Sequence, residues 1–175
     1  ETFPESGVDA YFDLLFEENN RPLPNTNKPV FVNAVTTLLN ELPGNCIRIN
    51  AWNGFLGRDT VEIAAAEINK PAASQIMQQL EWQHIFVPDI RGMIAARGIS
   101  MIINEAYFAL GDKVSSKAEI DIAMKLGTNY PLGPFEWSEK IGLKNIYNLL
   151  KTLSVEDDRY IAAPFLEQEL TNRIT

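Results

Sequence analysis

The stretch that decides the fold is residues 120–144, IDIAMKLGTNYPLGPFEWSEKIGLK. Just before it, Ser116 and Glu119 have the spacing of a capping box, so a helix is predicted to begin at Lys117. Gly127 is expected to end this helix, because glycine readily adopts the left-handed conformation found at many helix ends. The stretch therefore begins inside a helix whose two ends are both indicated by local sequence signals.

Further helices are predicted on both sides of this first one. Pro134 follows Gly133, and proline in the first helical turn loses no hydrogen bond, so a helix is expected to begin there. Gly142 separates that helix from the next. Residues 90–110 are apolar on nearly every side, which indicates a helix buried among others. The full set of predicted helices covers residues 90–110, 117–126, 135–141, 143–153 and 164–174.

The first half of the chain has the character of strands rather than long helices. Short runs rich in β-branched and aromatic residues predict strands over residues 10–16, 29–35, 46–50, 60–64 and 83–87. Helical stretches are expected at residues 36–41 and 72–81, and this alternation is typical of an α/β layer. We therefore predict an α/β lobe over residues 1–88 and an all-α domain over residues 89–175.

Composition excludes several classes of protein. The chain has 175 residues, 46% of them hydrophobic and 22% charged, which is typical of a folded chain and not of a disordered one. Its net charge of −8 disfavours binding to nucleic acid or to an anionic membrane surface. The apolar run at residues 93–110 contains Arg97, Asn104 and Glu105, so it indicates a buried helix and not a membrane span.

The counts of cysteine and histidine restrict the chemistry. A single cysteine, Cys46, excludes an intrachain disulfide, and a single histidine, His84, excludes a zinc site with two histidines. We expect no metal and interpret His84 as a structural residue. The cysteine usage fits a reducing compartment and no positively charged leader opens the chain, so we expect a cytoplasmic protein.

The ordered motifs of residues 104–144 resemble the C-terminal domain of the 3-hydroxyacyl-CoA dehydrogenases. That family carries an Asp, Met and Gly series on one helix, followed by Tyr-Pro, Gly-Pro-Phe and Gly-Leu. The matching positions here are Asn104, Glu105, Ala106, Asp121, Met124, Gly127, Pro131, Gly133, Pro134, Phe135, Gly142 and Leu143. The resemblance implies that a truncated, Rossmann-like second half of the NAD-binding domain precedes this helical domain.

The family's cofactor site has no counterpart in the sequence. In the family, a Gly-x-Gly-x-x-Gly turn at a helix N-terminus holds the pyrophosphate of NAD. The ten glycines here include no Gly-x-Gly pair. We therefore expect no cofactor in this chain, although the family uses NAD.

The family's catalytic pair is retained only in part. Residues 48–54, RINAWNG, resemble the family segment Gly-Leu-His-Phe-Phe-Asn-Pro, which places the catalytic histidine on Asn50. The family's glutamate, twelve residues later, is present as Glu62. Histidine suits a general base because its pKa lies near neutrality, whereas an asparagine amide accepts no proton at a useful pH. The resemblance therefore implies a site that has lost its base.

Other positions are assigned to substrate binding by the same resemblance. It implies that Arg48, Trp52, Asn53 and Arg97 lie near a cleft for an acyl-CoA-like ligand. The family's substrate-binding serine falls on Val35, and a further polar position falls on Ala96. Neither side chain can donate the hydrogen bond expected there.

Three functions follow from this comparison. The first is a non-catalytic 3-hydroxyacyl-CoA dehydrogenase-like protein of fatty-acid metabolism, a homodimer through its helical domain that binds an acyl-CoA-like molecule. The second is an active NAD-dependent oxidoreductase of the same family, whose NAD-binding half lies upstream of this chain. The third is a pure protein-interaction module. None of them involves nucleic acid or a membrane.

Overall fold

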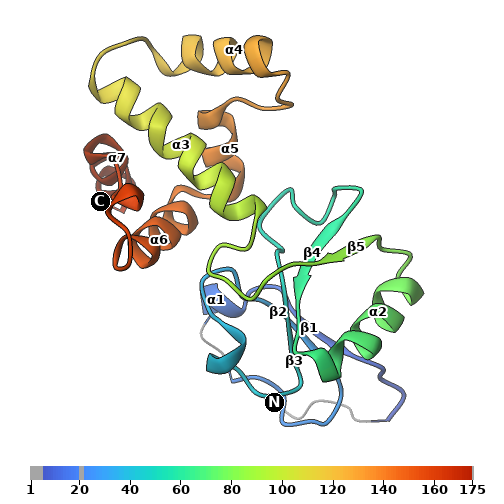
Figure 1. The fold of residues 1–175 in the computed structure, drawn as a ribbon. Coiled ribbons are helices and arrows are strands. Elements are labelled where there is room, and N and C mark those ends of the chain that lie inside the picture. The colour runs from blue at the N-terminus through green and yellow to red at the C-terminus, as the bar shows by residue number, and fades with distance from the viewer. Residues whose placement is uncertain (1–5, 20–21, 175) are drawn as a thin grey trace. The chain divides into compact units, whose positions relative to one another are not determined.

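A computed structural model of the chain describes residues 6–19 and 22–174 (Figure 1). The chain divides into two compact units, Glu1–Ile94 and Ala95–Thr175. The first is an α/β lobe and the second is all helical, so the predicted fold class is confirmed. Along the described ranges, no helix combines the length and the apolar character that crossing a bilayer requires.

The first unit is built on a five-stranded mixed sheet in the order β1-β2-β3-β4-β5. Strands β1, β2 and β3 run parallel, β4 is antiparallel to β3, and β5 is parallel to β4. The bounds are β1 (Tyr11–Asp13), β2 (Val30–Asn33), β3 (Cys46–Ile49), β4 (Val61–Ala64) and β5 (His84–Phe86). Each strand lies inside a run predicted from the sequence.

The sheet is covered on both faces, and this explains its apolar central strands. On one face, Phe31 and Ile63 pack against Met77 of helix α2 (Lys70–Gln79), and all three side chains are fully buried. On the other face, Val30 and Cys46 belong to a second buried cluster. A strand that is buried on both faces reads as a continuous apolar run, as β2 does.

Two predicted elements of this unit are shorter than expected. The helix expected at residues 36–41 is only a single 3₁₀ turn, Leu39–Glu41, because the preceding threonines bind a carboxylate through their backbone N–H groups. The strand expected at residues 10–16 ends at Asp13, whose side chain accepts a hydrogen bond from Leu15 N and forms a turn. A short helix, α1 (Phe16–Asn19), follows.

Within residues 95–174, which the structure describes, the second unit contains five α-helices. Their bounds are α3 (Ala95–Gly111), α4 (Lys117–Thr128), α5 (Pro134–Ile141), α6 (Leu143–Ser154) and α7 (Pro164–Ile174). The core includes Ile103 of α3, Ile146 and Leu150 of α6 and Leu166 of α7, all fully buried. Asn104 is also fully buried, and its side chain bonds the backbone of residues 161 and 163, which fixes the turn before α7.

The ends of these helices confirm some local signals and correct others. Ser116 and Glu119 form the predicted capping box at the start of α4. Gly127 does not end α4, however; the helix continues to Thr128, and Asn129 adopts the left-handed conformation with φ of 55°. Asparagine tolerates this conformation because its short polar side chain bonds locally. Helix α3 begins later than expected because Met93 just before it has φ of 47°.

Candidate functional site

The positions assigned to the catalytic pair lie opposite each other where the antiparallel strands β3 and β4 meet the loop between them. Asn50 directly follows β3, and Glu62 lies in β4. Their backbones bond through Asn50 N and Glu62 O at 3.1 Å, and the side-chain Nδ2 of Asn50 donates to Glu62 Oε2 at 3.2 Å. Asn50 is 2% exposed. The structure therefore brings together the two residues that the sequence places twelve positions apart.

A second buried asparagine supports this corner of the sheet. Asn33 ends β2 and is 4% exposed; its Oδ1 accepts from Ala51 N at 3.0 Å, and its Nδ2 donates to Leu14 O at 3.1 Å. Asn50 Oδ1 in turn accepts from Trp52 N at 3.4 Å. Asn33 is not among the site residues predicted from the sequence. The signal that could have found it is a polar residue closing an otherwise apolar, buried strand.

Arg48 is fully buried, and its guanidinium binds partners in the first unit of the chain. Its guanidinium donates to Ala34 O at 2.8 Å and to Val35 O and Ile90 O at 3.1 Å each, and it forms an ion pair with Asp89. Burial lowers the pKa of Arg48, while the negative charges of Asp89 and Glu17 act in the opposite direction.

These contacts tie the end of β2 to the segment that leads out of the sheet. Val35 O also accepts a hydrogen bond from Gly92 N at 2.7 Å. Val35 is the position to which the resemblance assigns the family's substrate-binding serine, and it is fully buried. That Arg48 binds a substrate remains a prediction.

The other predicted binding residues have different environments. Trp52 is 4% exposed and packs edge to face against Phe55, whereas Asn53 is exposed. Arg97 belongs to helix α3 of the helical unit, where its guanidinium lies 5.3 Å from the ring centre of Tyr160. Their roles in ligand binding also remain predictions.

His84, the only histidine in the sequence, lies in β5 opposite Val61, the residue before Glu62. Its Nε2 is 3.0 Å from Ser74 Oγ of α2, and its ring packs edge to face on Phe86. Its contacts thus join α2 to the sheet. Within residues 6–19 and 22–174, no three His, Cys, Asp or Glu side chains come together as a metal site would need.

The Asn50–Glu62 pair has a limited chemical capacity. The amide of Asn50 donates one hydrogen bond and accepts one, and it takes up no proton at neutral pH. The carboxylate of Glu62 holds the amide as a carboxylate would hold an imidazole. The arrangement can orient a polar group, but Asn50 cannot remove a proton from an alcohol.

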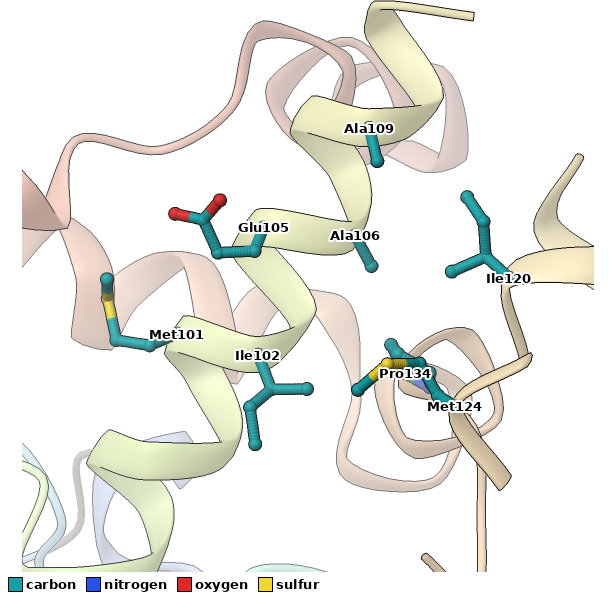
Figure 2. Close-up of a pocket in the computed structure, with 8 residues that line it drawn as sticks. All are labelled: Met101, Ile102, Glu105, Ala106, Ala109, Ile120, Met124 and Pro134. Atoms are coloured by element: carbon teal, nitrogen blue, oxygen red, sulfur yellow. The ribbon is translucent and has the colours of Figure 1, made fainter. Parts of the chain in front are cut away.

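The helical unit carries an apolar groove of about 370 Å³. Figure 2 shows Ile102, Ala106 and Ala109 of α3 on one side, with Ile120 and Met124 of α4 across from them. Pro134, Met101 and Glu105 complete the lining, and Glu105 is the one charged residue among those that line it. Exposed apolar residues also lie on α4 outside this lining, with Ile122 52% and Leu126 82% exposed.

Comparison with known proteins gives a consistent result. Residues 92–173 match the family model for the 3-hydroxyacyl-CoA dehydrogenase C-terminal domain. The chain is 39% identical over 114 residues to 3-hydroxyadipyl-CoA dehydrogenase of Escherichia coli K12, covering 62% of this chain and 24% of that protein. It is 40% identical over 130 residues to 3-hydroxybutyryl-CoA dehydrogenase of Clostridioides difficile, covering 71% of this chain and 46% of that protein. The chain thus spans from a quarter to just under half of these relatives' lengths.

Solved structures show the same fold. The crystal structure of (S)-3-hydroxybutyryl-CoA dehydrogenase from Ralstonia eutropha aligns with a TM-score of 0.76 at 22% identity, covering 94% of this chain and 66% of that one. The 3-hydroxybutyryl-CoA dehydrogenase structure from E. coli K12 aligns with a TM-score of 0.61 at 35% identity, covering 71% of this chain and 27% of that one. At 22% identity, the likeness to the Ralstonia eutropha structure shows a shared fold alone.

Proposed function

Since the chain belongs to the 3-hydroxyacyl-CoA dehydrogenase family, we propose that it is a non-catalytic member whose Asn50–Glu62 pair does not carry out dehydrogenation. The observation that carries the proposal is the hydrogen bond from Asn50 Nδ2 to Glu62 Oε2 at 3.2 Å. It keeps the family's two positions paired in space, while the group that would accept the proton is an amide.

The chemistry explains why this replacement matters. Oxidising a 3-hydroxyacyl thioester moves a hydride from C3 and a proton from the hydroxyl, and the proton requires a base whose pKa lies near the working pH. An imidazole meets that requirement and an amide does not. In this chain, Glu62 can position Asn50, but the amide of Asn50 cannot accept the hydroxyl proton of a substrate.

The residues present do not fit the family's cofactor. NAD accepts the hydride when bound, and its pyrophosphate needs the close backbone approach that Gly-x-Gly-x-x-Gly provides. No such spacing occurs among the ten glycines of these 175 residues. No hydride-transfer step is therefore assigned to these residues.

The test is the reduction of acetoacetyl-CoA by NADH, measured with the natural polypeptide and with its Glu62→Gln variant. Glutamine can still accept the hydrogen bond from Asn50, so the variant is expected to fold. If this corner is non-catalytic, Glu62→Gln leaves any NADH oxidation unchanged. Asn50→Ala is the second variant and is expected to behave in the same way.

A clear result would overturn the proposal. NADH oxidation that falls tenfold or more in Glu62→Gln, while the melting temperature is unchanged, would establish a working oxidoreductase at this corner. The matched control is Asp59→Asn, which makes the same change from carboxylate to amide at an exposed position of the same loop and leaves the Asn50–Glu62 bond intact.

The proposal has three further parts. It includes homodimerisation through the helical unit, which the apolar groove between α3 and α4 supports. It includes binding of an acyl-CoA-like ligand, supported by relatives named for CoA thioesters, and a cytoplasmic location, supported by the single buried Cys46. Acetoacetyl-CoA is then expected to raise the melting temperature. A dimer whose melting temperature responds to neither acyl-CoA nor NADH would instead be an interaction module.

A further inference from the structure

The loop that follows β2 surrounds one carboxylate oxygen with hydrogen-bond donors. Glu17 Oε1 accepts from Thr36 N and Thr36 Oγ1 at 2.7 Å each, from Thr37 N at 2.9 Å and from Thr37 Oγ1 at 3.2 Å. Glu17 comes from helix α1, nineteen residues earlier in the chain than Thr36. All three residues are half-buried, so this donor cradle, defined by Thr36 and Thr37, lies within reach of solvent.

The number of donors exceeds what one carboxylate oxygen can use well. A carboxylate has about four lone-pair sites shared between two oxygens, so a single oxygen satisfies about two donors. A phosphoryl group presents three strong acceptor oxygens around one centre and would divide the four donors among them. The cradle therefore offers more hydrogen bonds than its present occupant can use.

The position and the electrostatics of the cradle also favour an anion. Strands β1, β2 and β3 are parallel, and the cradle follows the carboxyl end of β2, the edge where open α/β sheets bind ligands. Arg91 donates to Thr36 O, and Arg48 lies close enough to Glu17 for the two charges to interact. Asp89 and Glu41 pair with these two arginines and moderate their field.

We propose that the Thr36–Thr37 cradle is a binding site for a phosphoryl group of an external ligand, and that Glu17 occupies it as an intramolecular competitor. Displacement of α1 would free the cradle, and removal of the Glu17 carboxylate would open it permanently. This site is separate from the Asn50–Glu62 pair, so it stands or falls independently of the dehydrogenase assay.

The experiment compares Glu17→Ala with the natural protein in inorganic phosphate, in sodium acetate and in sodium chloride of equal ionic strength. Phosphate at ten times its Kd is expected to raise the melting temperature of Glu17→Ala by about 4 °C. The natural protein should gain less than about 1 °C at the same concentration, because Glu17 competes. Phosphate also stabilises proteins without binding, so the difference between the two proteins is the readout.

Matched variants isolate the cradle. Glu18→Ala removes the exposed neighbouring carboxylate and should respond to phosphate as the natural protein does. Adding Thr37→Val to Glu17→Ala removes one donor at constant volume and should reduce the phosphate shift. AMP and CoA then separate the sources: tighter binding than inorganic phosphate indicates a nucleotide-type ligand, and equal binding indicates free phosphate.

Three results would overturn the proposal. Equal phosphate shifts in Glu17→Ala and the natural protein would show only non-specific stabilisation. Stabilisation of Glu17→Ala by acetate and not by phosphate would show that the cradle selects carboxylates. If Glu17→Ala does not fold, Glu17→Gln keeps the volume without the charge; phosphate should then bind it at least tenfold tighter than the natural protein by phosphorus NMR, and equal affinity contradicts the proposal.

Discussion

At the scale of single residues, Arg48 is the buried charge on which the sheet edge depends. Replacing it with methionine keeps an apolar stem of similar length but leaves three backbone carbonyls and Asp89 without its donors. Unsatisfied buried groups are costly, so Arg48→Met is expected to lower the free energy of unfolding by about 3 kcal/mol, measured by urea denaturation. Arg58→Met, at an exposed arginine over Phe55, should cost less than about 1 kcal/mol. Equal losses in the two variants would contradict this role.

The proximity of Asn50 and Glu62 could be predicted from the sequence, whereas the environment of Arg48 could not. The resemblance placed Asn50 and Glu62 at one corner, and the return of β4 beside β3 brings them together. The alternation of side chains along β3 places Ile47 and Ile49 on one face and Arg48 on the other. Alternation distinguishes two faces but does not say that both are covered. The burial of Arg48, and its pairing with a residue 41 positions away, depend on tertiary packing.

At the scale of elements, helix α5 takes its N-terminal cap from another helix. The buried carboxylate of Asp121 in α4 accepts from Phe135 N at 2.8 Å and from Glu136 N at 3.3 Å. A Cβ at Gly133 would overlap this carboxyl group. Gly133→Ala and Asp121→Ala are each expected to lower the free energy of unfolding by about 1–2 kcal/mol, measured by thermal or urea unfolding.

A double variant tests whether both changes act through the same contact. Because Gly133→Ala destabilises chiefly by displacing Asp121, the combined loss should be smaller than the sum of the single losses. The control is Gly98→Ala in α3, where a Cβ would have open space, and a helical glycine-to-alanine change is expected to be neutral or stabilising. Fully additive losses would show that the two residues act separately.

The starts of helices α4 and α5 could be predicted because the sequence signals that mark them are local. The capping box of α4 and the proline at the start of α5 both mark helix starts that the structure confirms. The end of α4 was misplaced at Gly127, because a glycine inside a helix and one beyond its end look alike without the tertiary context. The helix predicted at residues 36–41 does not form as such because the backbone N–H groups of Thr36 and Thr37 bind Glu17, which is distant in sequence.

At the scale of the whole molecule, the groove between α3 and α4 tests the proposed assembly. Its lining is apolar apart from Glu105, as expected for a surface that a second copy covers. Met124→Lys would place an ammonium group in that contact, where desolvation without a partner is costly. We expect the dimer dissociation constant, measured by sedimentation equilibrium, to rise more than tenfold.

The matched control for Met124→Lys is Ala118→Lys, because it adds the same charge to the same helix at an exposed position that does not line the groove. It should leave the dissociation constant within about twofold of the natural value, since a solvated charge away from the contact has little effect on affinity. Circular dichroism should show the same helix content in both variants. A natural protein that is monomeric at micromolar concentration, or an equal loss of affinity in the two variants, would mean that this groove is not the surface through which the chain assembles.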